Sequence, residues 1–285
     1  MKYALFMAFV GVGMSLFLRR YIIRHVFTPK KKEAQTYPNS TYENIEVELD
    51  IGTMRGWFIK SEGVRGCFLL VHGWGSHKSN MLRYVDPLIA SGYDVIMMDV
   101  LGHGQSDAIQ KQVSIKSFVQ SIKATIDYVE ERTDINSHAI YVLGHSMGGT
   151  AASIVNATDE RIQALITDSM PTSLKNISQS MAGNITLPYR PFGWLLISWF
   201  LIRGGVFIKA RKEWRLEKIM NNQQSPALAI HGTQDTKVPI SNVNVLLTHS
   251  NFKQVIKVET KGHDNCVKDN SFWEKIFRFI TDNRP

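Results

Sequence analysis

The stretch LGHSMGGTAA, residues 143–152, decides the fold of this chain. It follows the apolar and partly β-branched run HAIYV and leads into GTAASIVNA, whose small residues are typical of a helix that packs closely on a sheet. The stretch therefore predicts a sharp strand-to-helix turn with Ser146 at its apex. Such a turn forces the serine into a sparsely populated backbone conformation, and the flanking Gly144 and Gly148 leave room for it.

Apolar runs of strand length alternate with helical stretches on both sides of this turn. After a polar linker at 33–43, two alternating runs at 44–51 and 54–60, joined by Gly52-Thr53, predict an antiparallel hairpin. Six near-continuous apolar runs follow, as expected for strands buried on both faces of a parallel sheet, at 67–71, 94–100, 138–144, 162–168, 226–232 and 253–259. The helical stretches lie near 80–91, 115–132, 147–158, 240–249 and 271–282. The sequence predicts one α/β domain over 44–285, with helices covering both faces of a mostly parallel sheet.

The turn at Ser146 has the G-x-S-x-G spacing of a nucleophile elbow. A lone G-x-S-x-G is also compatible with a plain turn, but here a strand precedes it and a helix follows it, which is the context that the motif requires. A serine hydroxyl is a poor nucleophile near neutral pH, so a histidine must take its proton and an acid must orient that histidine. In open α/β sheets, ligands bind at the carboxyl ends of the strands, so both partners are expected in the loops there.

Among the nine histidines, we predict that His263 is the base. It lies in ETKGHDN, a loop between the last predicted strand and the terminal helix, from which an imidazole can reach across to Ser146. His145 adjoins the serine but points elsewhere on a tight turn. His72 and His231 end strands and are expected to hold loops by hydrogen bonds.

Two aspartates compete for the role of the acid. Asp235 lies in HGTQDTKVP, three residues after Gly232 at the end of the strand 226–232, and Asp168 ends the strand 162–168. A plain turn or helix-capping aspartate is the structural alternative for Asp235. The order nucleophile, acid, base along the chain favours Asp235.

The loop HGWG, residues 72–75, follows a buried strand directly and supplies the remaining requirement, an oxyanion hole. We predict that the backbone N–H groups of Trp74 and Met147 form the donor pair. The helix that starts after Ser146 adds the positive end of its dipole. A purely structural loop is the alternative for residues 72–75.

Five motifs together resemble the α/β-hydrolases of the serine aminopeptidase and lysophospholipase-like group, in particular their bacterial membrane-anchored members. They are VHGWGSHKSN, GYDVIMMDVLGHGQSD, LGHSMGG, HGTQDTKVP and KGHD, and the resemblance extends from about residue 45 to the C-terminus. It implies the α/β-hydrolase fold and Ser-His-Asp chemistry without a metal or an organic cofactor. It also implies that the long connection at about 170–224 is a helical cap over the active site.

The composition of this connection bears on the substrate. Residues 192–202 form an apolar run, too short to span a membrane, and residues 203–218 carry six Lys or Arg against two Glu. A site that grips the free amine of a peptide needs carboxylates, so these charges favour acyl esters or anionic amphiphiles as the small-molecule substrate.

We therefore predict a serine hydrolase that cleaves an acyl ester, of lipid-like character, or an amide, through Ser146, Asp235 and His263. The alternative within the same chemistry is a serine aminopeptidase-type peptidase. A binding scaffold without catalysis is the alternative of another class, because a fold does not fix a function. A halogen-removing enzyme uses an aspartate nucleophile, and Ser146 argues against it.

The N-terminal segment 1–32 is expected to be a membrane anchor with a basic flank. Residues 3–18 carry no charge and would span about 24 Å as a helix at ~1.5 Å per residue, slightly short of the hydrocarbon core, and the apolar residues up to 23 extend it. The basic residues all follow the apolar run except Lys2, which predicts a single pass with the catalytic domain in the cytoplasm. A cleaved signal peptide is the alternative, but no A-x-A-like site follows the run.

Charge and cysteine content exclude other classes of function. The formal net charge is +8, but residues 1–32 hold seven Lys or Arg and no acid, so the remainder has 26 basic and 25 acidic residues. A nearly neutral domain without a basic stripe argues against nucleic-acid binding. The two cysteines form neither a disulfide framework nor a metal-ligand spacing.

Overall fold

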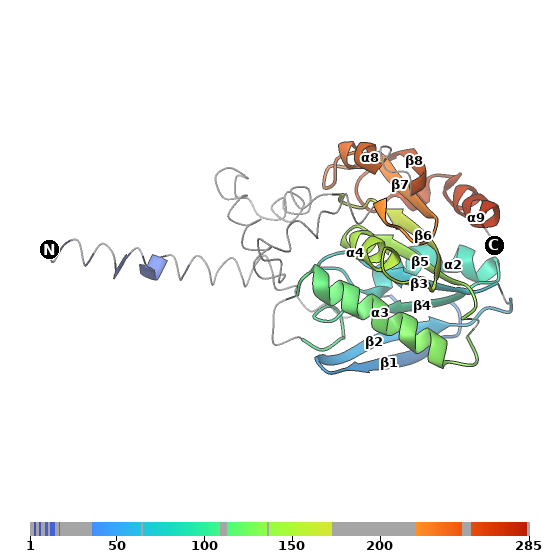
Figure 1. Cartoon of the computed structure of the whole chain (residues 1–285), viewed down its shortest axis with the longest axis horizontal. Coiled ribbons are helices and arrows are strands. Elements are labelled where there is room, and N and C mark those ends of the chain that lie inside the picture. Colours follow the sequence, from blue (N-terminus) through green and yellow to red (C-terminus); the bar gives the residue numbers. More distant parts are fainter. Residues whose placement is uncertain are drawn as a thin grey trace.

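The computed structural model describes residues 36–63, 65–108, 113–135, 137–172, 221–246 and 252–283, together with residues 3, 6, 9, 10, 12–14 and 17. In these residues the chain folds around an eight-stranded sheet (Figure 1). The strands are β1 (Glu43–Leu49), β2 (Gly52–Ile59), β3 (Cys67–Val71), β4 (Asp94–Met98), β5 (Ile140–His145), β6 (Ile162–Asp168), β7 (Ala227–Gln234) and β8 (Phe252–Lys261). The described helices are η1 (Lys78–Tyr84), α2 (Val85–Ala90), α3 (Ile115–Glu131), α4 (Met147–Asn156), α8 (Ser241–Leu246), η3 (Cys266–Lys268) and α9 (Phe272–Asp282).

The strand order is β1-β2-β4-β3-β5-β6-β7-β8. β1 pairs with β2 and β2 with β4 in antiparallel fashion, whereas every pair from β4 to β8 is parallel. The predicted hairpin and mostly parallel sheet are therefore confirmed. Because β3, β5, β7 and β8 run in the same direction, their carboxyl ends meet at one edge of the sheet, where the site is expected.

The turn of the hairpin differs from the prediction, which joined the two strands by Gly52-Thr53. Leu49 pairs with Gly52, so Asp50 and Ile51 form the turn and Gly52 opens β2. Gly52 has a φ of +133°, a backbone conformation that disfavours residues with a side chain. The glycine therefore shapes the first residue of the strand rather than the turn itself.

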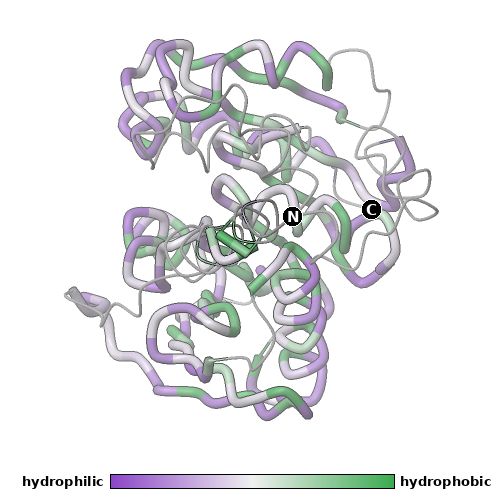
Figure 2. Tube along the Cα trace, turned by 90° about the vertical axis from the view of Figure 1, so that its left-hand side faces the viewer, coloured by the Kyte–Doolittle hydropathy of each residue, from purple (hydrophilic) through white to green (hydrophobic). Residues whose placement is uncertain are grey.

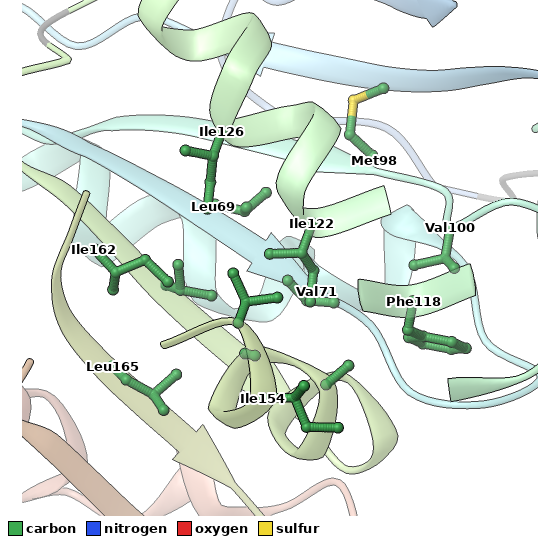
Figure 3. Packing of buried hydrophobic residues seen from close by; sticks show 14 of the residues in the cluster. Leu69, Val71, Met98, Val100, Phe118, Ile122, Ile126, Ile154, Ile162 and Leu165 are labelled. Carbon is green, nitrogen blue, oxygen red and sulfur yellow. The ribbon is translucent and has the colours of Figure 1, made fainter. Parts of the chain in front are cut away.

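Helices cover both faces of the sheet, as predicted. On one face, Phe118, Ile122 and Ile126 of α3 pack with Leu69 and Val71 of β3 (Figure 3). Along the helices of the domain, hydrophobic and hydrophilic stretches alternate (Figure 2). This is the pattern of helices with one buried face.

The second core lies on the opposite face, under η1, α2 and α9. Leu88 of α2 and Phe272 and Ile276 of α9 pack there with Phe68 and Leu70 of β3. Alternate residues of β3 thus enter different cores, because successive side chains of a strand point to opposite faces. This explains why the run CFLLV is apolar at every position.

A buried ion pair ties the loop after β3 to the loop after β4. Lys78 Nζ lies 2.7 Å from Asp99 Oδ2, and each side chain is only 1% exposed. The Asp99 carboxylate also accepts the backbone N–H groups of Lys78 (2.6 Å) and Gln105 (2.9 Å). Gly104, at a φ of +49°, packs so closely on this carboxylate that a Cβ there would collide with it. The pair therefore fixes the segment that leads out of the predicted oxyanion loop.

Replacing Asp99 with alanine is expected to lower the free energy of unfolding by about 3–5 kcal/mol, because it leaves the Lys78 ammonium buried without a counter-charge. Urea denaturation measures this loss. The matched control is Glu274→Ala in the Glu274–Arg278 pair of α9, whose side chains are 66% and 69% exposed. That change should cost no more than about 1 kcal/mol. Equal losses in the two variants would contradict the importance of the buried pair.

Several sequence predictions fall outside the described residues. They are most of the predicted anchor and its flank at 1–32, residues 173–220 of the predicted cap at 170–224, and the end of the helix predicted at 240–249. Among the residues that the structure describes, no helix has both the length and the apolar character needed to cross a bilayer. Residues 36–42 of the predicted linker contain neither helix nor strand.

Candidate active site

Ser146 lies between β5 and α4 in the strained conformation that its motif predicts. Its φ and ψ are 53° and −122°, and Ser169 is the other described non-glycine residue with a positive φ. The Ser146 N–H donates to the carbonyl of Asp168 at 2.8 Å, and its own carbonyl accepts the N–H of Thr150 at 3.2 Å. Neighbouring structure thus holds the serine in a conformation that it would not adopt by itself.

The glycines around Ser146 are required by close backbone contacts. A Cβ on Gly144 would lie 2.6 Å from the N and Cα of Gly149. A Cβ on Gly148 would collide with the carbonyl oxygen of Val71 at the end of β3. A Cβ on Gly73 would lie 3.1 Å from the Cβ of Ser146. The start of α4 therefore packs directly against β3 and the loop that follows it.

Asp235 and His263 meet at the carboxyl ends of β7 and β8. His263 Nδ1 lies 2.6 Å from Asp235 Oδ2. The second oxygen, Oδ1, accepts the backbone N–H groups of Lys237 (2.8 Å) and Val238 (3.0 Å). Gly262, at a φ of +97°, leads the chain from β8 into the loop that carries His263. The structure therefore joins these two predicted residues, 28 positions apart, in one buried hydrogen bond.

The environment of Asp235 keeps its carboxylate ionised at neutral pH. Burial raises the pKa of Asp235, but the hydrogen bond from His263 and those from the backbone lower it by more, so the pKa lies below its ordinary value. An ionised carboxylate only accepts hydrogen bonds. The His263 proton therefore sits on Nδ1, and Nε2 of a neutral His263 carries the lone pair that can accept a proton.

Asp168, the competing acid, has other partners. Its Oδ2 accepts the hydroxyl of Tyr84 at 2.6 Å, and its Oδ1 accepts the hydroxyl of Ser169 at 2.8 Å. Among the hydrogen bonds of the described residues, the imidazole of His263 pairs with Asp235 and not with Asp168. The geometry therefore favours Asp235 as the orienting acid.

His145, the residue before the serine, contacts the loop that carries His263. The rings of His145 and His263 lie with their centroids 4.8 Å apart, and His145 Nε2 is 3.1 Å from the His263 carbonyl oxygen. Within the described residues, Ser146 makes no side-chain hydrogen bond to His263. The structure thus places the serine next to a residue that contacts the histidine, but the serine and the histidine are not joined directly.

The predicted oxyanion loop is held by His72. The ring accepts the Val100 N–H at Nε2 (3.0 Å), which leaves Nδ1 to donate to the Gly73 carbonyl at 2.8 Å. The prediction that His72 holds a loop is confirmed, and so is that for His231, whose Nε2 lies 2.7 Å from the Val238 carbonyl oxygen. Burial lowers the pKa of His72 and so keeps its ring in the neutral form that these bonds need.

Trp74 and Met147 flank the serine from two elements. Trp74 follows Gly73, whose Cα lies against Ser146, and its indole stacks on Phe118 of α3 with ring centroids 6.3 Å apart. Met147 is the first residue of α4, directly after the serine. Both predicted donors therefore belong to segments that contact Ser146.

The two cysteines are poorly suited to act as nucleophiles. Cys67 and Cys266 are free and buried, and burial raises the pKa of both thiols. A buried thiol with a raised pKa is a weak nucleophile. Among the described residues, no group of three or more His, Cys, Asp or Glu side chains has an arrangement that could hold a metal ion.

Parts of this chain are similar in sequence to a known family and to known proteins. The sequence profile of the serine aminopeptidase (S33) family matches residues 62–188. The α/β hydrolase domain-containing protein WAV2 of Arabidopsis thaliana is 27% identical over 73% of this chain and 66% of its own length. The uncharacterized protein YfhR of Escherichia coli O157:H7 is 29% identical over 97% of this chain and 93% of its own length.

The same fold occurs in a solved structure. The esterase Pf2001 of Pyrococcus furiosus superimposes with a TM-score of 0.71 and 19% identity, over 91% of this chain and 99% of the esterase. At this identity the likeness establishes the fold alone. Together with the antiparallel hairpin, the parallel sheet and the elbow, it shows that this chain has the α/β-hydrolase fold.

Proposed function

We propose that this chain is a serine hydrolase that cleaves acyl esters through a covalent acyl-enzyme. Ser146 is the nucleophile, His263 the general base and acid, and Asp235 the orienting carboxylate. The observation that carries this proposal is the 2.6 Å hydrogen bond between His263 and Asp235 at the sheet edge where Ser146 occupies its strained elbow. A hydrogen bond from the serine to the histidine is often long or absent without substrate and tightens in the Michaelis complex.

In the first step, His263 Nε2 takes the proton of the Ser146 hydroxyl while Oγ attacks the ester carbonyl. The backbone N–H groups of Trp74 and Met147 stabilise the oxyanion, and each such donor is worth on the order of 3–4 kcal/mol. The protonated His263 then gives its proton to the leaving alcohol as the C–O bond breaks. Asp235 stays ionised and stabilises the imidazolium.

In the second step, water releases the acyl group. His263 Nε2 takes a proton from the water, whose oxygen attacks the acyl carbonyl, and the same N–H groups hold the second oxyanion. Return of the proton to Ser146 Oγ expels the carboxylic acid and restores the free enzyme.

Two features support an ester as the substrate rather than a peptide. The superimposed structure is that of an esterase, and basic residues outnumber acidic ones at 203–218, so the chain offers few carboxylates there for a substrate amine. The match to the serine aminopeptidase family favours the second candidate, a peptidase with the same three residues. The apolar run at 192–202 favours substrates with an apolar or amphiphilic acyl chain.

A fluorophosphonate probe and a substrate panel test this proposal. The probe should label Ser146, and p-nitrophenyl esters of graded chain length should turn over faster than aminoacyl-p-nitroanilides. Faster turnover of the anilides would establish the peptidase instead. Folded protein that takes up no probe at Ser146 would point to a binding scaffold.

We further propose that residues 3–23 anchor the chain in the cell membrane, with the catalytic domain in the cytoplasm. The support is the uncharged run at 3–18, the basic residues after it, and the exposure of Tyr3, Phe6 and Phe9, at 88%, 64% and 79%. The chain should remain in the membrane pellet after extraction with alkaline carbonate, and protease added to intact cells should spare the domain. Release by carbonate, or digestion from outside, would contradict the anchor or its orientation.

A further inference from the structure

The imidazole of His145 lies between the two loops that complete the candidate site. It is only 5% exposed, and Nε2 is 3.1 Å from the carbonyl oxygen of His263 and 3.4 Å from Asp264 Oδ1. On its other side is the predicted oxyanion loop, where a Cβ added to Gly73 would lie 3.5 Å from His145 Nδ1. The catalytic steps above give this ring no task, although it adjoins the nucleophile.

The protonation state of His145 is fixed by its surroundings. Burial lowers its pKa well below the ordinary value, and the charges of Arg83 and Lys237 act in the same direction, against the opposing effect of the hydrogen bond to His263. The ring is therefore neutral and carries one N–H. A carbonyl oxygen only accepts hydrogen bonds, so this proton lies on Nε2 and is donated to His263.

A second contact holds the same loop from η1. Arg83 Nη1 lies 3.5 Å from Asp264 Oδ1 and donates to the Asn80 carbonyl at 3.0 Å. The guanidinium also stacks on Tyr84, with its Cζ 4.7 Å from the ring centroid. The residue after His263 is thus tied to a helix that belongs to the second core.

These contacts matter because they reach the backbone of His263 itself. Two other bonds hold the flanks of the loop, from the Gly262 N–H to the Gln234 carbonyl (3.2 Å) and from Asn265 Nδ2 to the Lys261 carbonyl (2.7 Å). The loop begins at Gly262, whose left-handed φ is accessible mainly to glycine, and the side chain of His263 is held at Nδ1 by Asp235. A hydrogen bond to the Asp235 carboxylate fixes Nδ1 but leaves the imidazole able to swing about that point. The bond from His145 to the His263 carbonyl fixes the backbone from which the ring extends.

We propose that His145 is a positioning residue, whose Nε2–H holds the loop of His263 so that the imidazole faces Ser146. This inference rests on the proposed function, because it assigns His145 a role in aiming the base of that reaction. A displacement of about 1 Å at a reacting group can reduce the rate on the order of 10²-fold. We therefore expect loss of the bond to reduce kcat and not substrate binding.

Two variants of His145 separate the hydrogen bond from the packing of the ring. His145→Met removes the donor and keeps much of the volume, whereas His145→Gln retains an N–H donor of similar reach. His145→Met should lower kcat for a p-nitrophenyl ester by about 10- to 100-fold with KM changed by less than about threefold. If His145→Met lowers kcat 100-fold, His145→Gln should lower it by no more than tenfold. The exposed His138→Gln is the control and should retain the activity of the unmodified chain.

Urea denaturation of the same variants separates positioning from stability, since the Met and Gln variants should unfold at similar urea concentrations. Equal activity of the Met and Gln variants, or full activity of His145→Met, would overturn the inference. Failure of the proposed function looks different, because the unmodified chain would then neither label at Ser146 nor turn over esters.

NMR spectroscopy tests the positioning role of His145 even if the chain does not hydrolyse esters. The Nδ1–H proton of His263, assigned by its loss in His263→Gln, should be visible in the unmodified chain and in His145→Gln. In His145→Met it should broaden, because movement of the loop weakens the bond to Asp235 and exposes the proton to faster exchange with water. An unchanged resonance in His145→Met would overturn the positioning role without reference to catalysis.

Discussion

Replacing Ser146 with alanine is expected to reduce ester turnover by about 10⁴- to 10⁶-fold, the range of losses on removal of the nucleophile from a Ser-His-Asp triad. The three residues act as a unit, so the loss should be nearly as large as that from removing all of them. The measurement is kcat/KM with a p-nitrophenyl ester, on protein whose unfolding in urea is recorded in parallel. A variant that keeps a tenth of the activity would show that another group attacks the substrate.

Ser146→Gly separates catalysis from backbone strain. It should lose as much activity as Ser146→Ala, because neither variant has the hydroxyl. It should also be more stable than the alanine variant by about 1–3 kcal/mol, because glycine adopts a positive φ without the strain that a Cβ introduces. Lower stability of the glycine variant would contradict the strained elbow.

Replacing Asp235 with asparagine is expected to lower kcat by about 10⁴-fold. The amide NH₂ can donate to His263 Nδ1, which would shift the ring proton to Nε2, where it blocks uptake of the proton of Ser146. The three acceptor contacts seen in the structure involve both carboxylate oxygens, and the amide keeps an oxygen for the N–H groups of Lys237 and Val238. We therefore expect the fold to persist and the loss to fall on catalysis.

The matched control for this change is Asp168→Asn, in the competing acid. Asp168 is bonded to Tyr84 and Ser169, so the change should alter kcat by no more than a few-fold, although it can lower stability. A greater loss of kcat from Asp168→Asn than from Asp235→Asn would reverse the assignment of the acid.

The sequence predicted the sheet well because its strands are buried on both faces. The runs 67–71 and 162–168 coincide with β3 and β6, since an apolar run bounded by polar or turn-forming residues leaves little freedom for the ends of a strand. The predicted position of the hairpin turn was wrong because Gly52-Thr53 has the composition of a turn, although both residues belong to β2. Only the pairing of Leu49 with Gly52 shows that the glycine belongs to the strand.

The motif at Ser146 predicted the elbow from local spacing. The collision that requires Gly144 arises between β5 and the helix after it, whereas Gly148 is required by the carbonyl oxygen of Val71 in β3. The pairing of Asp235 with His263 was predicted from the chain order nucleophile, acid, base, which Asp168 satisfies as well. The 2.6 Å bond between His263 and Asp235 distinguishes the two aspartates. Two features could not be predicted in this way. The bond from His145 to His263 joins residues 118 positions apart, and the Lys78–Asp99 pair joins segments that meet because β3 lies beside β4.

In the proposed mechanism, Ser146, His263 and the predicted oxyanion loop converge on one reacting carbonyl. A crystal structure of the chain after reaction with a fluorophosphonate would reveal this convergence. We expect phosphorus bonded to Ser146 Oγ, a phosphonate oxygen about 2.7–3.1 Å from the N–H groups of Trp74 and Met147, and His263 Nε2 within hydrogen-bond distance of Oγ. A phosphonate on another residue, or an adduct on Ser146 with the imidazole of His263 turned away from it, would contradict the proposed mechanism.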